Sequence, residues 1–235
     1  MNRPLSKDKS VALLRYLQAA AYPMQYDAGK HRLTLSDASG NEQAFFRLPL
    51  GLTYLGDGQV AEEPDLHYVI LLIQSGNCAL GYFENGNCVK HKVFRSYMVR
   101  KKQGKSQIKY LKTKGKSRAG SRVRLGETVE FFENINERLQ AYFEEHEVHR
   151  IALSCSKTLL PYLFNAKVRT PFTKSDPRLY KIPRHIHTPI YEVLLDAQRF
   201  LMKGELIYEE AQEHAVNALL AEIEDSFDEA DQDDK

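Results

Sequence analysis

His67-Tyr-Val-Ile-Leu-Leu-Ile73 is a continuous run of β-branched and apolar residues. Such a run is typical of a central strand that is buried on both faces of a sheet. Ser75-Gly76-Asn77 turns the chain into a second expected strand over residues 78–83. Asn85-Gly86, a strong hairpin signal, turns it again into a third strand over residues 88–94. These residues predict a strand meander around which the rest of the chain is organised.

The residues after position 126 predict the helices and the further strand that complete this domain. An apolar stripe predicts an amphipathic helix over about 127–146, and its members are Val129, Phe132, Ile135, Leu139 and Phe143. A strand over 150–154, a helix near 157–165, an irregular stretch over 170–189 and a core helix from Pro189 follow. We therefore expect an α/β domain over residues 66–205, with a mixed β-sheet and flanking helices.

The residues before this domain carry weaker patterns. Residues 8–21 predict a helix, residues 31–35 and 43–49 predict short strands, and glycines punctuate residues 51–58. Residues 59–66, rich in Glu, Asp and Pro, indicate a linker into the next domain. We expect residues 1–62 to form an accessory α+β region.

The charge of the chain is strongly segregated. The formal net charge is only +2, yet residues 85–126 contain 14 lysines and arginines and no acidic residue. Concentrated positive charge is typical of a nucleic-acid site. From Glu205 to Asp234 there are 12 acidic residues and no lysine or arginine. We expect residues 206–235 to form an acidic C-terminal helix or tail that is solvated and disordered from Glu222 onward. A tail that folds back on the basic segment and competes with RNA is the alternative.

The composition excludes several classes of protein. The three cysteines, Cys78, Cys88 and Cys155, lack C-x-x-C spacing, so neither a disulfide framework nor a zinc module is expected. No segment has the apolar core of a signal peptide or the ~18 apolar residues of a membrane span. No phosphate-binding loop or dinucleotide fingerprint is present. We expect a soluble, cytoplasmic monomer with no cofactor and no bound metal.

Residues 100–125 indicate an exposed, mobile segment that binds a polyanion. Lysine, arginine, serine, threonine, glutamine and glycine dominate it, so few of its residues suit a core. A fourth strand over 97–100 is expected to lead into the segment, and a short helix is expected over 106–112. Because no base-reading module is recognisable in it, we expect it to recognise the backbone and shape of RNA.

One tetrapeptide in this segment, Gly104-Lys-Ser-Gln107, suggests chemistry. A glycine lets the backbone approach a ligand closely or take a positive φ. Gln107 can donate and accept a hydrogen bond but does not titrate. Such a side chain suits orienting an attacking water or hydroxyl and stabilising a developing oxyanion. Taken alone, the tetrapeptide favours an ordinary polar loop.

The wider segment resembles the catalytic region of the Vms-like release factors, which act in ribosome quality control. These are relatives of the middle domain of eukaryotic peptide-chain release factor, and their pattern combines Gln-Gly, a small residue and Gln with a later Ser-Ala-Gly-Ser and a basic residue. The matching residues here are Gln103-Gly104, Ser106, Gln107, Ala119-Gly120-Ser121 and Arg124. The resemblance covers about residues 66–205, including Thr188-Pro189 ahead of the last core helix. It implies a release-factor middle-domain-like fold with a long basic catalytic loop.

The resemblance also implies a function and a set of site residues. Members of the family act on peptidyl-tRNA stranded on a stalled large ribosomal subunit, and they either hydrolyse the ester or cut the tRNA near its acceptor end. An enzyme of the peptidyl-tRNA hydrolase type is therefore implied, with a tRNA endonuclease left open. Gln107 would be the catalytic glutamine, and Gly104 and Ser106 would shape the turn. The residues implied to hold tRNA and ribosomal RNA are Arg100, Lys101, Lys102, Lys105, Lys109, Lys112, Lys114, Lys116, Arg118, Arg122 and Arg124.

The sequence departs from the family pattern in two ways. Lys105 stands where several relatives have glycine, which narrows the allowed backbone conformations there. This departure keeps a second hypothesis open, a non-catalytic RNA- or ribosome-binding protein. The ankyrin repeats, zinc finger and segregase-binding tail of the eukaryotic members are missing, which indicates a compact prokaryotic version.

Other chemically active side chains have simpler interpretations. His185 and His187 suit metal ligation, but no third ligand stands near them in the sequence, so a surface or RNA-contacting role is favoured. His146 and His149 follow a Glu-rich helix end, where capping and solvent roles suffice. Cys155 follows a strand, and a small buried thiol is favoured over a nucleophile.

Overall fold

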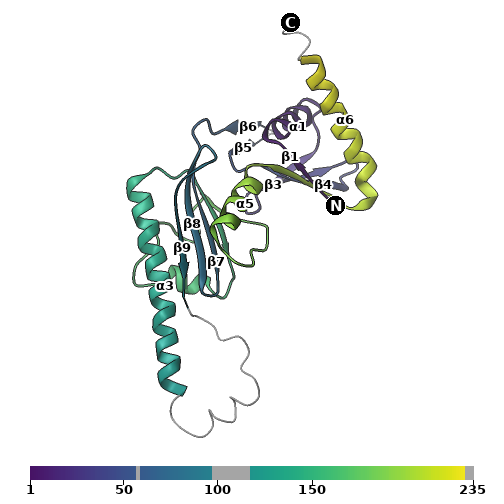
Figure 1. The fold of residues 1–235 in the computed structure, drawn as a ribbon. Helices are drawn as coiled ribbons and strands as arrows, with labels where there is room; N and C mark the ends of the chain where they lie inside the picture. The colour runs from purple at the N-terminus through teal and green to yellow at the C-terminus, as the bar shows by residue number, and fades with distance from the viewer. Residues whose placement is uncertain (57–58, 97–116, 231–235) are drawn as a thin grey trace. The chain divides into compact units, whose positions relative to one another are not determined.

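The structure is a computed structural model that describes residues 1–56, 59–96 and 117–230, with side chains described for residues 126–223 of the last range. The chain forms two compact units, one made of residues 1–66 and 198–235, the other of residues 67–197 (Figure 1). In the described part of the chain, no helix combines the length and the apolar character that crossing a membrane requires.

The first unit is built on a five-stranded antiparallel sheet in the order β1-β12-β4-β3-β2. Its strands are β1 (Asn2–Leu5), β12 (Gly204–Ile207), β4 (Glu42–Arg47), β3 (Arg32–Ser36) and β2 (Met24–Asp27). β12 is an inner strand, and its Leu206 is fully buried in the core. The structure thus groups residues 198–235 with residues 1–66, whereas the sequence patterns suggest a domain ending at 205 and a separate tail.

Helix α1 (Lys7–Ala19) confirms the helix predicted over 8–21. It begins after Ser6, whose side chain accepts a hydrogen bond from the Lys9 amide at 3.2 Å, as N-cap residues do. At Gly204 of β12, an added Cβ atom would lie 2.3 Å from the Ser10 Oγ atom of α1. Glycine at this position therefore lets the helix pack directly on the sheet.

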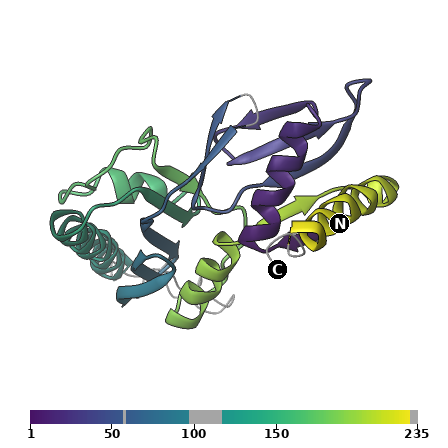
Figure 2. The same ribbon diagram turned by 90° about the horizontal axis from the view of Figure 1, so that it is seen from above.

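The acidic C-terminal segment forms a helix up to Ala230, as one form of the prediction had it, and over residues 222–230 this helix replaces the expected disorder. The short 3₁₀ helix η1 (Glu210–Gln212) leads into helix α6 (Glu213–Ala230). Val216 and Ile223 are buried, and Leu219 and Leu220 pack beside them in the core of the first unit. These four apolar residues follow helical spacing and form the stripe that holds α6 in place. Figure 2 shows α1 and α6 beside the strands of this unit.

Residues 51–66 also differ from the prediction of glycine punctuation followed by a linker. Strands β5 (Leu52–Gly56) and β6 (Gln59–Glu62) pair antiparallel in a separate two-stranded sheet. The sequence patterns do not predict this pair of strands, because a short hairpin needs few apolar residues and these strands stand among glycines and acidic residues. The strands predicted over 31–35 and 43–49 are confirmed as β3 and β4.

The second unit is built on a mixed five-stranded sheet in the order β11-β10-β7-β8-β9. Its strands are β7 (His67–Gln74), β8 (Asn77–Glu84), β9 (Asn87–Arg95), β10 (Arg150–Cys155) and β11 (Leu179–Lys181). The predicted meander is confirmed as β7, β8 and β9, with β7 central and its residues 68–73 fully buried. Asn85 and Gly86 have φ values of 49° and 88°, as a two-residue hairpin of type I′ requires.

Strand β11 was not predicted, because it lies inside the stretch 170–189 that the sequence analysis treats as irregular. It comprises only three residues, and Pro177 and Pro183 flank it. It pairs in parallel with β10, which itself pairs in parallel with β7. Short helix α4 (Leu160–Phe164) follows β10, within the helix predicted near 157–165.

Helix α3 (Ser117–Glu145) covers one face of this sheet and begins ten residues before the predicted start (Figure 1). Residues 117–125 are therefore the first turns of a helix, which corrects the expectation that the helix begins at about 127. Phe132, Ile135 and Leu139 are buried as predicted, whereas Val129 is 41% exposed. The early turns carry few apolar residues, so sequence periodicity could not reveal them.

Helix α5 (Tyr191–Leu201) begins two residues after Pro189 and packs against the other face of the sheet. A Cβ atom at Gly81 of β8 would lie 2.9 Å from the Leu194 Cδ2 atom. The glycine thus permits the close contact between α5 and the sheet. With helices on both faces of a mixed sheet, the predicted α/β fold class is confirmed.

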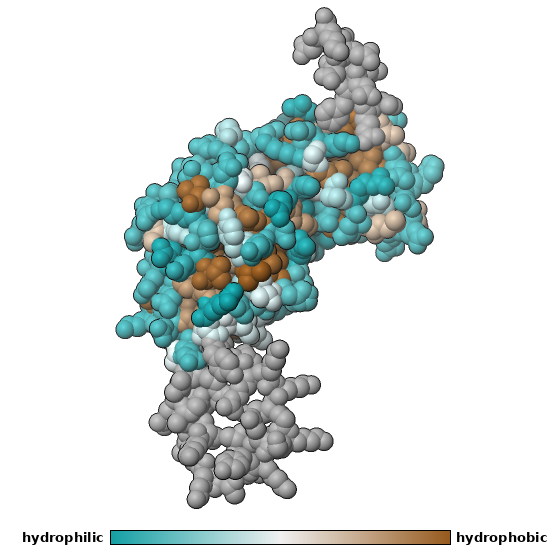
Figure 3. All heavy atoms as spheres, viewed as in Figure 1, coloured by the Kyte–Doolittle hydropathy of each residue, from teal (hydrophilic) through white to brown (hydrophobic). Residues whose placement is uncertain are grey.

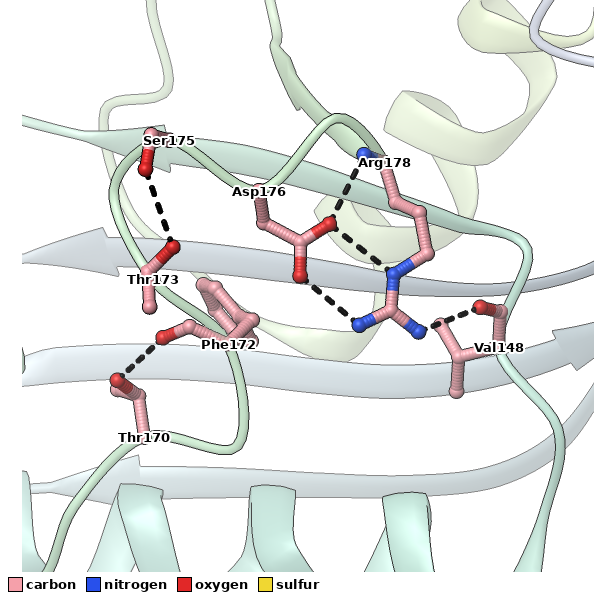
Figure 4. A network of polar contacts seen from close by, with 7 residues as sticks. All are labelled: Val148, Thr170, Phe172, Thr173, Ser175, Asp176 and Arg178. Carbon is pink, nitrogen blue, oxygen red and sulfur yellow. Dashed lines mark hydrogen bonds and ion pairs between the residues drawn. The ribbon is translucent and has the colours of Figure 1, made fainter.

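A network of polar contacts lies at the edge at which β7, β10 and β11 begin, which we call the amino edge (Figure 4). Arg178 donates from Nε and Nη2 to the two carboxylate oxygens of Asp176, at 3.0 and 2.8 Å. Its Nη1 donates to the Val148 carbonyl oxygen at 3.0 Å. The hydrogen bonds from Arg178 lower the pKa of Asp176. This network fixes the loop before β11 to the chain before β10.

Figure 3 shows that apolar residues on the drawn face form small patches set among hydrophilic ones. This distribution is normal for a protein surface.

Candidate functional site

The predicted catalytic residues Gly104, Ser106 and Gln107 lie in the segment 97–116, outside the described residues. The predicted RNA-binding residues Arg100, Lys101, Lys102, Lys105, Lys109, Lys112, Lys114 and Lys116 lie there too, as do the expected strand over 97–100 and helix over 106–112. Arg118, Arg122 and Arg124 belong to the first turns of α3, where only the backbone is described. The roles of all these residues stay predictions.

The structure does show where this segment joins the fold. Strand β9 runs in the same direction as β7, β10 and β11, because β8 is antiparallel to both β7 and β9. The last residues of these strands therefore lie at one edge of the sheet, which we call the carboxyl edge; they are Gln74, Arg95, Cys155 and Lys181. In open α/β sheets, ligands bind outside the carboxyl ends of the strands.

Ser96, the residue before the segment, is tied both to this edge and to α3. The Ser96 amide donates to the Gly76 carbonyl oxygen at 2.8 Å. The Ser96 Oγ atom donates to the Glu127 carbonyl oxygen of α3 at 3.4 Å. The predicted catalytic segment therefore follows a residue at the carboxyl edge. It leads into α3, which contacts the same edge through Glu127, ten residues after the helix begins.

A cavity of about 320 Å³ lies beside this junction, between the end of β9 and α3. Its lining residues are Phe94, Arg95, Ser96, Glu127, Glu130, Phe131 and Asn134. The Oε2 atom of Glu127 is buried and has no hydrogen-bond partner among the described residues. Glu127 is also the first acidic residue after the acid-free run, so the strong positive charge ends where the helix meets the sheet.

A second basic run, residues 148–191, supplies cations that the sequence analysis missed. It contains eight lysines and arginines and a single acidic residue, Asp176. Asp176 pairs with Arg178 at 2.8 Å. Lys157 follows β10 and is exposed, as are Lys181 at the end of β11 and Arg184 beyond it. The signal is the same acid depletion that marks residues 85–126, and counting acids along the whole chain would have found it.

The pair His185 and His187 also lies beyond β11, in an irregular loop and not on a strand. Both side chains are exposed, and their rings meet edge to face with centroids 4.4 Å apart. Ile186 between them is buried, and its carbonyl oxygen accepts a hydrogen bond from Gln74 Nε2 at 2.6 Å. In the part of the chain that the structure describes, no group of three or more His, Cys, Asp or Glu residues could hold a metal ion. A surface or RNA-contacting role for the pair stays a prediction.

The cysteines offer no activated thiol. Burial raises the pKa of Cys155, at the carboxyl edge, to about 12. Burial also raises the pKa of Cys78 well above its usual range. With these raised pKa values, both side chains stay protonated at neutral pH. The thiolate, which is the nucleophile, is therefore scarce. The Cys155 side chain is partly buried, not fully buried as expected, and its raised pKa agrees with an inert thiol.

The histidines at the end of α3 make structural contacts in place of the capping and solvent roles that were predicted. The ring of His146 stacks on Tyr82, with centroids 4.2 Å apart. The Nδ1 atom of His149 accepts a hydrogen bond from the His67 amide at 3.2 Å. Glu145 pairs with Lys90, and the hydrogen bond from Lys90 lowers the pKa of Glu145.

Comparison with known proteins identifies relatives of the chain. The protein family described as bVLRF1, Bacteroidetes VLRF1 release factor, matches residues 68–209, which is more than half of the chain. No curated protein matches it in sequence. Among solved structures, one titled "Vms1 mitochondrial localization core" is similar at a TM-score of 0.40 and 11% identity, over 87% of this chain and 84% of that chain. That likeness is too distant to add to the family match.

Proposed function

The chain belongs to the family of Bacteroidetes VLRF1 release factors, and from this premise we propose that it frees nascent chains from peptidyl-tRNA on stalled large ribosomal subunits. The family membership confirms the predicted resemblance to the Vms-like release factors and supports a function of the release-factor type. The finer proposal concerns the substrate, the bond that is cleaved and the residue that directs the cleavage. The partners in this proposal are the large ribosomal subunit and peptidyl-tRNA, and the reaction takes place in the cytoplasm.

The observation that carries the proposal is the place of the acid-free run in the fold. The run holds Gly104-Lys-Ser-Gln107 and 14 cations, and it is attached to the carboxyl edge of the sheet through Ser96. The second basic run adds Lys157, Lys181 and Arg184 near the same edge. A polyanion such as tRNA would thus meet positive charge from several segments of the second unit at once.

The proposed chemistry is hydrolysis of the ester that joins the nascent peptide to tRNA. A water molecule attacks the ester carbonyl carbon, the bond from that carbon to the tRNA oxygen breaks, and a proton from the water ends on the tRNA oxygen. The products are a free peptide carboxyl group and a tRNA hydroxyl group. The Gln107 side chain would orient the water and stabilise the developing oxyanion without changing its own protonation state.

The direct test is release of a labelled nascent chain from purified complexes of large subunit and peptidyl-tRNA. The wild-type protein should release the chain, and Gln107→Ala should slow release roughly 100- to 1,000-fold, the usual cost of losing one oxyanion-stabilising donor. Thr113→Ala, a neutral change in the same segment, serves as the matched control and should release at the wild-type rate.

Binding to the large subunit must be measured beside release. Gln107→Ala should bind as tightly as the wild type, because it removes no charge. Equal release by wild type and Gln107→Ala would refute the catalytic role of Gln107. Absence of release by the wild-type protein, with binding retained, would instead favour the non-catalytic ribosome-binding alternative that Lys105 keeps open.

A further inference from the structure

A groove in the second unit lies between α3 and α4, outside the predicted catalytic segment. Its volume is about 320 Å³, and its lining residues are Val129, Phe132, Glu133, Pro161, Tyr162, Asn165, Ala166 and Lys167. Val129 and Tyr162 are 41% and 43% exposed. Exposure of aliphatic and aromatic side chains to water is unfavourable. A groove in which such side chains gather therefore indicates a surface that a ligand covers.

The aromatic part of the groove is held rigidly. The Tyr162 ring stacks on that of Phe132, with centroids 5.8 Å apart and 17° between the ring planes. Phe132 is fully buried in the core, so it cannot move away from Tyr162 without disturbing the sheet contacts of α3. Tyr162 therefore presents a ring whose position is set before any ligand arrives.

The walls of the groove are held together by Asn136, one turn of α3 after Phe132. This fully buried side chain donates from Nδ2 to the carbonyl oxygens of Leu163 and Val168, at 2.9 and 2.8 Å. These hydrogen bonds fix α4 and the chain that follows it against α3. A groove that is formed in advance binds a ligand with little further loss of conformational entropy.

The rim of the groove has the mixed polarity that the edge of a nucleobase requires. The carboxylate of Glu133 accepts hydrogen bonds, the ammonium group of Lys167 donates them, and the amide of Asn165 does both. RNA-binding proteins recognise unstacked bases by stacking them on aromatic side chains and hydrogen-bonding their edges. We propose that this groove binds one unstacked base of an RNA strand, with Tyr162 as the stacking surface.

The positive charge lies on the α4 side of the groove, whereas the α3 side carries Glu130, Glu133 and Glu137. The α4 side favours RNA over a protein segment as the occupant. The α4 wall lies within the second basic run, whose only acidic residue, Asp176, is paired with Arg178. Lys167 lines the groove itself, and Arg169 and Lys174 are exposed in the chain that follows it. A phosphate backbone entering or leaving the groove would meet these cations.

This inference rests on the proposed function only in taking RNA as the partner, and it is independent of catalysis by Gln107. It adds a contact with a base to an interface that otherwise recognises backbone charge and shape. Residues 100–125 contain no recognisable base-reading pattern, and the groove lies outside that segment.

The test compares two probes on the full-length protein, a fluorescent eight-nucleotide uridine RNA and an abasic strand of the same length. Tyr162→Ala should weaken binding of the RNA roughly 5- to 150-fold, the range for loss of one base–aromatic stack. The same variant should leave binding of the abasic strand unchanged. Tyr162→Phe keeps the ring and should bind RNA within about twofold of the wild type, and Leu55→Ala, an exposed apolar residue of the first unit, is the matched control.

Three outcomes would overturn the proposal: unchanged RNA binding by Tyr162→Ala, equal losses for both probes, or no binding of the RNA by the wild type. The first would leave the groove to a protein segment. Gln107→Ala keeps the proposal distinct from catalysis, because it should bind the RNA probe normally whether or not it releases nascent chains. Thermal unfolding followed by circular dichroism checks that Tyr162→Ala is folded.

Discussion

The two edges of the sheet in the second unit use positive charge in opposite ways. At the amino edge, the Arg178 guanidinium forms an ion pair with Asp176 and donates a further hydrogen bond to the Val148 carbonyl oxygen. At the carboxyl edge, Lys157 and Lys181 are exposed, and neither forms an ion pair with any acidic side chain that the structure describes. Cations that are paired hold the fold together, and cations without an acidic partner remain available for a polyanion. The acid-free run joins the fold at the second kind of edge.

The largest effect that we predict concerns chemistry at the carboxyl edge. If this edge supplies charge and no nucleophile of its own, Cys155 should be inert. Its pKa of about 12 lies more than three units above that of a free cysteine, so its thiolate fraction at pH 7 falls by about 1,000-fold or more. Alkylation of the native protein by iodoacetamide, followed by mass spectrometry, should modify Cys155 slower than a free thiol by that factor.

A companion variant separates accessibility from function. Cys155→Ser should release nascent chains at the wild-type rate. Two results together would contradict the contrast between the edges: rapid alkylation of Cys155 in the wild type, and loss of release in Cys155→Ser. The carboxyl edge would then carry its own nucleophile.

The next effect concerns stability at the amino edge. Arg178→Ala removes the paired hydrogen bonds to Asp176 and the one to Val148, and should lower the free energy of unfolding by about 1–3 kcal/mol. Lys157→Ala at the carboxyl edge should change it by less than about 0.5 kcal/mol. Urea denaturation followed by circular dichroism measures both. Similar losses for the two variants would show that the edges do not differ in the way described.

The reverse contrast is expected for binding of tRNA. The double variant Lys157→Ala/Lys181→Ala should bind labelled tRNA roughly 10-fold more weakly at physiological salt, with a salt-dependence slope smaller by about two. Arg178→Ala, measured well below its unfolding midpoint, should keep both the affinity and the slope. An unchanged slope in the double variant would exclude contacts between these lysines and phosphates.

The smallest effect is a dependence of stability on pH that belongs to the amino edge. Arg178 lowers the pKa of Asp176 below its ordinary value of 3.8. A carboxyl group whose pKa is lower in the folded state stabilises the fold above its unfolded value and loses that contribution as pH falls through the folded value. The stability difference between wild type and Asp176→Asn should therefore be constant above about pH 5 and shrink toward pH 2. A difference that does not vary with pH would contradict the role given to this ion pair.

The parts of the fold that were predictable from the sequence are those in which local patterns and packing agree. The run at 67–73 has the composition of a buried strand and is one, and Asn85-Gly86 takes the turn that its residue types favour. Elements with few apolar residues were missed. Strand β11 has three residues, and the first turns of α3 carry mainly polar and basic side chains.

Charge also concealed structure in the first unit. The apolar stripe of Val216, Leu219, Leu220 and Ile223 marks α6 as an amphipathic helix, but its many acidic neighbours suggested disorder. β12 was missed because its pairing with β1 and β4 joins residues some 160 to 200 positions apart, which no local pattern encodes.

For the candidate site, the sequence supplied residue types and the structure supplied their common edge. Gly104, Ser106 and Gln107 were identified from a motif, and they lie outside the described residues. The contribution of Lys157, Lys181 and Arg184 depends on which strand ends meet in the sheet. That arrangement follows from the parallel pairing of β10 with β7 and β11, a tertiary property that a linear motif cannot contain.

The central claim is that the protein frees nascent chains by hydrolysing the ester bond. Its most direct test is the size of the tRNA that remains after a release reaction on large-subunit complexes, read on a sequencing gel with the tRNA labelled at its 5′ end. The proposal predicts a full-length tRNA, produced by the wild type and not by Gln107→Ala. A tRNA shortened near its acceptor end would contradict ester hydrolysis and identify the protein as a tRNA endonuclease.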